Sequence, residues 1–306
     1  MFKYSLDNKR YHTLNYFYRT KFNSKVFKVP LDAHMSCPNK INGNGCIYCS
    51  DFSKSNIINS KESIEEQFLN NIKVLENKWP NSLYIPYFQA GTNTYAPLET
   101  LKGLFESLLK FDKVVGLAIA TRPDTLSNEV MDYLGELNKK TFLTIELGLQ
   151  SSNNKTLDFI KRGHDVDCFV NTVKKLKEKG IFVVAHIING LPYETEEDML
   201  NTIKLLNDLK VDGVKIHMLY ISKNTELADI YEKEKFSILS KEEYIDIVIK
   251  QLELLDEKIV IERITGDPIK EDLITPDWLL KKFCVLNDID KEMVKRNTYQ
   301  GKLVNN

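Results

Sequence analysis

The sequence predicts an α/β fold in which parallel strands alternate with helices. Short apolar runs rich in Val, Ile and Phe alternate with helix-patterned stretches, and most runs are too apolar to be exposed on either face. About six such repeats imply parallel strands with right-handed crossovers, in an open doubly wound sheet or a full or partial barrel. The expected strands are Phe27–Leu31, Leu83–Gln89, Val114–Ala120, Phe142–Leu147, Phe182–Ile188 and Val214–Leu219.

Capping patterns mark where three of the intervening helices begin. A hydroxyl residue followed three positions later by an acid satisfies the first free backbone N–H groups of a helix. A fourth helix has an apolar stripe at Phe169, Val173 and Leu176 and is expected to stop at Gly180, since glycine commonly ends helices. The capping patterns are Ser63–Glu66, Thr195–Asp198 and Ser240–Glu243.

Polar residues recur near the carboxyl ends of four expected strands. One polar residue in a strand is usually satisfied locally, but four strands with the same pattern favour a common site. In a barrel, these positions look into the mouth, where active sites are built. Counting every second residue gives the pairs Tyr87 and Gln89, Thr144 and Glu146, Val184 and His186, and Lys215 and His217.

Composition narrows the class of protein. With 306 residues, 42% hydrophobic and 28% charged, the chain is neither a disordered tail nor a disulfide-stapled miniprotein. The 42 basic and 43 acidic residues leave a net charge of −1, so no overall basic field attracts nucleic acid. No apolar stretch could span a bilayer, and the polar N-terminus lacks a signal-peptide core. The expectation is a cytoplasmic enzyme with no membrane partner.

Three of the five cysteines fall within thirteen positions, at Cys37, Cys46 and Cys49. Three thiolates can hold three irons of a cubane cluster and leave the fourth iron open. A structural zinc site would need a fourth ligand, for which His34 is the local candidate. A thioredoxin-like pair would need no third cysteine. The iron–sulfur cluster is the favoured interpretation, and the zinc site is the alternative.

The other two cysteines are not expected to bind metal. Cys168 is interpreted as part of a helix beside its buried stripe, and Cys284 as a packed apolar side chain.

The cysteine motif resembles that of the radical S-adenosylmethionine (SAM) enzymes, and the resemblance to this family extends over nearly the whole chain. The resemblance is strongest to the YhcC/YtqA-like subgroup, which is akin to the catalytic subunit of Elongator. It implies a [4Fe–4S] cluster whose open iron chelates SAM, and electron transfer that releases a 5′-deoxyadenosyl radical. It also implies a partial (βα)6 TIM-type barrel with a C-terminal extension.

The resemblance assigns cluster ligands and SAM contacts along successive strands. Cys37, Cys46 and Cys49 correspond to the catalytic cluster ligands. Gln150 would contact the ribose or methionine portion of SAM and Arg162 its carboxylate, whereas a lone Arg162 would by default be a solvated charge at a helix end. The implied SAM contacts are Tyr48, Gln89, Ala90, Gly91, Thr92, Glu146, Gln150, Ser151, Arg162, His186, Ile188 and Gly190.

Some of these matches have ordinary structural explanations. Ala90 stands where relatives have a glycine. Thr121–Asp124 is similar to the family's Arg-Pro-Asp turn, but a proline-set turn with an Asp hydrogen bond would look the same. His186 occupies the polar position of the fifth-strand motif and Ile188 the adenine contact, although a lone strand histidine is more often structural. His217 could face substrate or fill the barrel.

The two ends of the chain are expected to flank the barrel. The expected divisions are an N-terminal segment at 1–30, the barrel at 31–260 and an extension or cap at 261–306. The N-terminal segment has seven basic and eight aromatic residues, which suits either RNA contact or packing over the barrel base. In the extension, Glu262, Arg263 and Asp267 are candidate substrate contacts, although an ion-paired turn would look the same.

The resemblance also suggests a substrate. The subgroup and its Elongator kinship point to tailoring the side chain of the tRNA wobble uridine, without acetyl transfer. One alternative is a radical SAM enzyme for a small metabolite or peptide, which the near-neutral charge favours. A remote alternative is a non-catalytic zinc-binding module. The expected electron donor is a flavodoxin or ferredoxin, and tRNA is the expected macromolecular partner.

Overall fold

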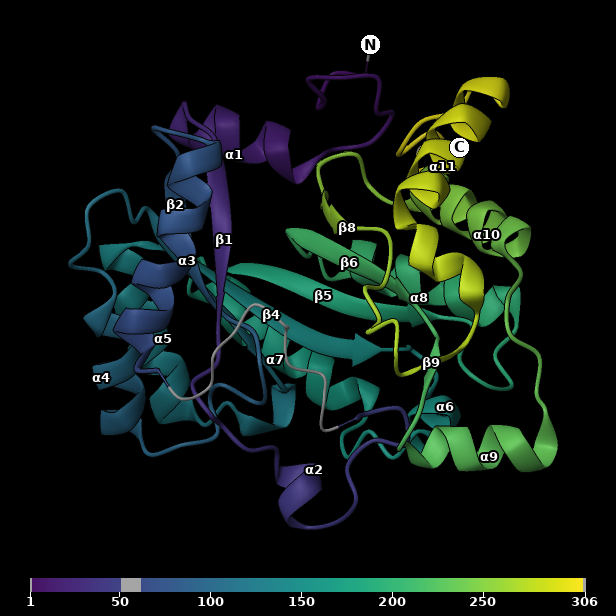
Figure 1. Ribbon diagram of the computed structural model, residues 1–306, viewed down its shortest axis with the longest axis horizontal. Helices are drawn as coiled ribbons and strands as arrows, with labels where there is room; N and C mark the ends of the chain where they lie inside the picture. The colour runs from purple at the N-terminus through teal and green to yellow at the C-terminus, as the bar shows by residue number, and fades with distance from the viewer. Residues whose placement is uncertain (1, 51–61, 305–306) are drawn as a thin grey trace.

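A parallel sheet of seven strands, curled into a half barrel, lies at the centre of the computed structural model, which describes residues 2–50 and 62–304 (Figure 1). Each strand of this sheet pairs in parallel with its neighbours, in the order β1-β2-β3-β4-β5-β6-β8. The bounds are β1 (Val26–Leu31), β2 (Leu83–Phe88), β3 (Gly116–Thr121), β4 (Phe142–Gln150), β5 (Phe182–Asn189), β6 (Gly213–Met218) and β8 (Val260–Arg263). Two short strands, β7 (Ile221–Ser222) and β9 (Leu273–Thr275), form a separate antiparallel pair.

All six expected strands are confirmed, and the half-barrel form agrees with the fold implied by the resemblance. The seventh strand, β8, was not expected as a strand. It has only four residues, two apolar and two charged, so its sequence gives no periodic signal. It joins the sheet beside β6 and places Arg263 at its carboxyl end.

Helices cover the outer face of the curled sheet (Figure 1). The capping boxes at Ser63, Thr195 and Ser240 are confirmed at the starts of three helices. None of the helices in the described ranges combines the length and apolarity needed to cross a bilayer. The helices are α1 (Leu14–Phe22), α2 (Pro38–Ile41), α3 (Ile64–Lys78), α4 (Leu98–Ser107), α5 (Asn128–Lys140), α6 (Asn154–Phe159), α7 (Val166–Glu178), α8 (Glu196–Asp208), α9 (Glu226–Glu234), α10 (Lys241–Leu254) and α11 (Lys282–Lys295), with 3₁₀ turns η1 (Pro123–Thr125) and η2 (Asp277–Lys281).

The main hydrophobic core packs this helical layer against the strands. The expected stripe of Phe169, Val173 and Leu176 is buried along α7 and belongs to this core. Cys168 lies beside the stripe and is partly buried, as expected. The expectation for Cys284 is wrong, because this side chain is exposed on α11. α11 packs on α10, and only part of its surface reaches the core.

Helix α1 closes the end of the half barrel where the strands begin. It contacts both edge strands, β1 and β8, and the residue before it, Thr13, forms a bridge with Ile261. Its Tyr18 is buried among side chains that point into the sheet's concave side, and the ring of Phe17 lies 4.9 Å from that of Phe182. The carboxyl ends of the strands are therefore left for a site.

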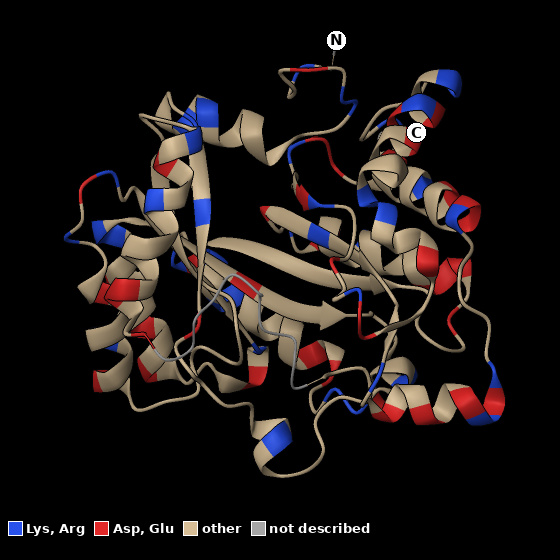
Figure 2. Cartoon of the chain, in the orientation of Figure 1, with Lys and Arg blue, Asp and Glu red and all other residues tan. Residues whose placement is uncertain are grey.

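Basic and acidic side chains are interspersed over the surface helices rather than gathered by sign (Figure 2). Two basic residues of the N-terminal segment pair with acids near the other end of the chain. Lys3 lies 2.5 Å from Glu257, and Lys9 forms an ion pair with Asp290. These pairs attach the N-terminal segment to the C-terminal part of the fold.

Candidate functional site

A cavity of about 690 Å³ opens at the carboxyl ends of the strands. Its size lies in the range of small-molecule sites, roughly 300–1,000 Å³. It is lined by the cysteine loop after β1, by the ends of β2 to β6 and by the end of β8. The site residues predicted from the sequence that line it are Cys37, Cys46, Tyr48, Cys49, Gln89, Ala90, Gly91, Thr92, Glu146, Gln150, Arg162, His186 and Ile188.

Ser151 and Gly190 do not line this cavity. Ser151 is buried and donates its hydroxyl to Glu194, while it accepts a hydrogen bond from the backbone N–H of Asn153 at 3.0 Å. Gly190 has a φ of +78°, and a Cβ there would lie 2.9 Å from Leu239, so the turn requires glycine. Both residues shape turns beside the site, and their contacts with SAM remain predictions.

The carboxyl group of Glu194, which accepts the hydrogen bond from Ser151, is expected to make the free energy of unfolding depend on pH. Burial raises its pKa from 4.5 to about 7. The folded chain therefore binds this proton more tightly than the unfolded chain, and stability decreases as the pH rises from about 4.5 to about 7. We expect Glu194→Gln, which cannot ionise, to be more stable than the parent protein above pH 7, by at most roughly 3 kcal/mol.

Urea unfolding at pH 5 and pH 8 measures this effect. The exposed Glu232→Gln variant is the matched control and should follow the parent protein at both pH values. An equal stability difference between Glu194→Gln and the parent protein at the two pH values would contradict the assignment.

The cysteine loop has a local reason for its shape. Helix α2 begins directly after Cys37, and its short turn ends in a glycine-containing loop. Gly45 has a φ of +81° and donates its N–H to the carbonyl of Asn39 at 3.0 Å, which returns the chain to Cys46. A further turn, from the N–H of Cys49 to the carbonyl of Cys46 at 2.9 Å, brings the last two cysteines together.

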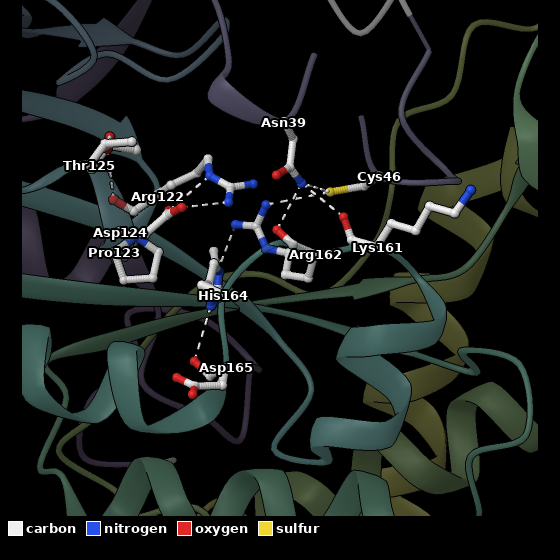
Figure 3. Close-up of polar contacts among 12 residues, drawn as sticks. Asn39, Cys46, Arg122, Pro123, Asp124, Thr125, Lys161, Arg162, His164 and Asp165 are labelled. Atoms are coloured by element: carbon white, nitrogen blue, oxygen red, sulfur yellow. Dashed lines mark hydrogen bonds and ion pairs between the residues drawn. The ribbon is translucent and has the colours of Figure 1, made fainter. Parts of the chain in front are cut away.

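Polar groups surround the thiol of Cys46 (Figure 3). Asn39 Nδ2 lies 3.5 Å from the sulfur and also donates to the carbonyls of Lys161 and Arg162, at 2.8 and 2.9 Å. Arg162 Nη1 lies 3.8 Å from the same sulfur, and Nη2 donates to the carbonyl of Gly148 at 2.8 Å. The sulfur of Cys46 therefore has a guanidinium and an amide donor as neighbours.

Two arginines turn unpaired N–H groups toward this region. Arg122 forms a bidentate ion pair with Asp124, at 2.9 and 2.7 Å, within the Thr121–Asp124 turn. Its Nη1, and Nε of Arg162, are buried and have no hydrogen-bond partner among the described residues. Buried donors without acceptors are costly, so both atoms fit a site that takes an acceptor from a bound ligand.

The loop after β2 approaches the cysteine loop closely at Gly91. Its φ is +77°, and a Cβ at this position would lie 2.1 Å from the carbonyl oxygen of Met35. Only glycine fits such a contact between two backbones. The contact between the two loops therefore depends on Gly91, whereas Ala90 beside it is buried without such a requirement.

The three cysteines of the triplet line one cavity at the carboxyl ends of the strands. Within the described parts of the chain, no three His, Cys, Asp or Glu side chains gather where one metal ion could hold them. Three thiolates that each bind a different iron of a cubane do not converge on one point, whereas zinc ligands do. His34, the candidate fourth zinc ligand, lines the cavity and lies 3.6 Å from Asp32.

A buried charge cluster forms the floor of the cavity, centred on Glu146. One carboxylate oxygen accepts from Lys28 at 2.7 Å. The other accepts from Tyr87 at 2.6 Å and from His186 at 2.8 Å, and it forms an ion pair with Lys215. Burial alone would raise the pKa of Glu146, but Lys215 and Lys28 outweigh burial and hold that pKa well below its usual range.

The histidines at this floor are neutral near pH 7. Burial lowers the pKa of His186 despite its hydrogen bond to Glu146, and burial lowers the pKa of His217 well below its usual range. Because a carboxylate only accepts hydrogen bonds, Nε2 of His186 carries the hydrogen that it donates to Glu146. The expected contact of Glu146 with SAM remains a prediction, since its oxygens are already bonded within the protein.

Sequence reasoning missed the members of this floor that join distant segments. Lys28 was counted with the basic residues of the N-terminal segment, but it reaches Glu262 at 2.5 Å as well as Glu146. Lys215 lies 3.7 Å from Glu262. The sequence indicates only that Lys215 shares a face of its strand with His217, and not which acid it pairs with. The available signal was a lysine inside an otherwise apolar strand, since such a residue is rarely buried without a partner.

Comparisons with known proteins agree with this site. The chain matches the model of the radical SAM superfamily over residues 37–206 and that of the radical SAM C-terminal domain over residues 211–295. It is 46% identical over 305 residues to the uncharacterized protein YtqA of Bacillus subtilis, covering 98% of this chain and 95% of YtqA.

Two longer archaeal proteins are similar to this chain over part of their own length. A tRNA uridine(34) acetyltransferase of Methanocaldococcus jannaschii is 29% identical over 158 residues, which is 51% of this chain and 29% of the acetyltransferase. The structure of Elp3 of Methanocaldococcus infernus, with an N-terminal deletion, superposes with a TM-score of 0.68 at 22% identity. That match covers 90% of this chain and 64% of the Elp3 chain, and it shows a shared fold.

Proposed function

This chain belongs to the radical SAM superfamily, and from this premise we propose that it modifies the side chain of the wobble uridine of tRNA. Enzymes of this superfamily use a [4Fe–4S] cluster and SAM and require a reductant. The observation that carries the substrate is the similarity to a tRNA uridine(34) acetyltransferase over 158 residues. The match covers 29% of the acetyltransferase. We therefore propose the same uridine as the substrate of this chain, but not acetyl transfer as its reaction.

The cysteine loop would hold the cluster. Cys37, Cys46 and Cys49 would each bind one iron, and the buried N–H donors of Arg162 and Arg122 fit an anionic ligand beside it. When bound, the cluster would supply the electron for the reductive cleavage of SAM into methionine and a 5′-deoxyadenosyl radical, the hydrogen-abstracting agent.

The remaining cavity residues would orient SAM. The Arg162 guanidinium is suited to bind the SAM carboxylate with parallel hydrogen bonds, beside the thiolate of Cys46. Gly91 lets the loop after β2 pack against the chain before Cys37, and Ile188 offers an apolar surface to the adenine. Gln150, also on the cavity wall, can donate and accept hydrogen bonds at the ribose or the methionine portion.

The floor would exclude water and would keep two polar hydrogens of the protein away from a radical in the cavity. Tyr87 and His186 donate their polar hydrogens to Glu146, so these hydrogens are held inside the protein rather than offered to the cavity. α1 closes the end of the barrel below this floor. A reactive radical in this cavity is thereby shielded from solvent on the closed side.

The partners follow from the same proposal. A low-potential flavodoxin or ferredoxin would supply the electron, and the enzyme would act on tRNA in the cytoplasm. The near-neutral charge, together with the pairing of Lys3 and Lys9 with acids, favours the second candidate, a radical SAM enzyme for a small metabolite or peptide.

Nucleoside analysis of tRNA separates the candidates. We expect tRNA from a deletion strain to lose one modified wobble uridine, and complementation by the parent protein but not by Cys46→Ala to restore it. We also expect deletion-strain tRNA to increase 5′-deoxyadenosine release by the reduced enzyme more than parent-strain tRNA does. An unchanged wobble profile together with no such increase would reject tRNA as the substrate and leave the metabolite or peptide.

A further inference from the structure

Arg263 ends β8 and lines the cavity from the edge of the sheet. It lies beside other cavity residues on this side, His217 and Tyr220. Burial lowers the pKa of His217, and its neighbours His186 and Arg263 lower it further. Arg263 therefore stands close to the floor of the cavity, on a different strand from the residues around Cys46.

An irregularity of the sheet turns this side chain into the cavity. Val214 of β6 pairs with Ile261, but the next residue, Lys215, pairs with Arg263, so Glu262 is an extra residue in β8. Successive side chains of a regular strand point to opposite faces, whereas a bulge redirects one of them. Glu262 can therefore reach Lys28 at 2.5 Å while Arg263 also lines the cavity.

The charge of Arg263 is not compensated by the floor. The two lysines, Lys28 and Lys215, are matched by the two carboxylates, Glu146 and Glu262. Within the described ranges, no acceptor lies within hydrogen-bond or ion-pair distance of the Arg263 guanidinium. The guanidinium is not fully buried, so it is accessible from the cavity, where a bound anion could pair with it.

We propose that Arg263 binds an anionic group of the substrate, a phosphate or a carboxylate. A guanidinium binds either group through two parallel hydrogen bonds. The assignment deepens the proposed function and rests on it: the anion would be a phosphate beside the uridine or an acidic group on its side chain. Arg162, by contrast, contacts Cys46 and belongs to the SAM side of the cavity.

Binding of small probes to the SAM-loaded holoenzyme tests this assignment. The probes are uridine, uridine 3′-monophosphate and uracil-5-carboxylic acid, with inorganic phosphate as a probe that assumes no base. We expect one of the two anionic uracil probes to bind at least about tenfold more tightly than uridine. The preferred anion distinguishes a phosphate source from a side-chain carboxylate.

Variants show whether this preference depends on Arg263. Arg263→Met should bind all uracil probes alike, Arg263→Lys should retain part of the preference, and the exposed Arg19→Met should retain all of it. Iron content and the urea midpoint verify that each variant is folded. Equal binding of charged and neutral probes by the parent protein, or a preference that persists in Arg263→Met, would overturn the assignment.

The outcome separates this inference from the proposed function. Phosphate binding that depends on Arg263, together with an unchanged tRNA profile in the deletion strain, would support the anion site. The same result would contradict the wobble uridine as the substrate. A lost wobble modification that Arg263→Met restores in full would keep the tRNA substrate and reject the anion site.

Discussion

We expect Cys46→Ala, purified without oxygen, to contain iron only at background and to release no detectable 5′-deoxyadenosine, with Cys37→Ala and Cys49→Ala behaving alike. The parent protein should contain about four irons per chain, the cubane stoichiometry. Each thiolate would hold one iron, and the cavity offers no spare cysteine, since Cys168 lies in α7 and Cys284 is exposed on α11. Iron analysis and chromatography of the SAM cleavage products measure both effects.

The other two cysteines provide the matched controls. Cys168→Ala and Cys284→Ala should keep the full iron content and the SAM cleavage of the parent protein. Loss of iron in either control would refute the ligand assignment. A colourless parent protein loaded with zinc would support the non-catalytic zinc module instead.

Removal of the charge at Glu146 should cause the largest loss of stability. Glu146→Gln leaves Lys28 and Lys215 buried with Glu262 as their remaining acidic partner. Leaving a buried charge uncompensated costs about 3–5 kcal/mol. We expect the free energy of unfolding, measured with urea, to fall by that amount, and the double variant Glu146→Gln with Lys215→Met to recover part of it.

The exposed ion pair between Glu76 and Lys113, at 3.0 Å, offers the control. Glu76→Gln should change the free energy of unfolding by less than about 1 kcal/mol, since solvent screens such pairs. A urea midpoint of Glu146→Gln equal to that of the parent protein would show that the floor does not depend on this charge.

The sequence was sufficient to predict the elements whose signals are local. Six strands, three capping boxes and the stripe of α7 depend on neighbouring residues, and all are confirmed. The sequence does not predict β8, because four residues are too few to show the alternation of apolar and polar residues that marks a strand. Its pairing with β6 forms only in the folded sheet. Cys284 was misjudged because burial depends on which face of α11 meets the core.

The candidate site was predictable to the extent that its motifs lie on successive strands. The cysteine triplet and the polar residues at strand ends converge on one cavity, as the common parity indicated. The charge cluster could not be derived, because Lys28 and Glu262 are 234 positions apart in the chain and meet only after the sheet curls. The two turn residues, Ser151 and Gly190, matched the family by position, yet lie outside the cavity wall.

Helix α1 constrains the kinetics as well as the fold. Because it contacts both edge strands, α1 covers the end of the sheet where the described strands begin, and the cavity opens at their carboxyl ends. In the proposed function, SAM and the tRNA would share this opening, and a bound tRNA would obstruct it. For the proposed tRNA substrate we therefore expect ordered binding, in which SAM binds first and its cleavage products depart after the tRNA has dissociated.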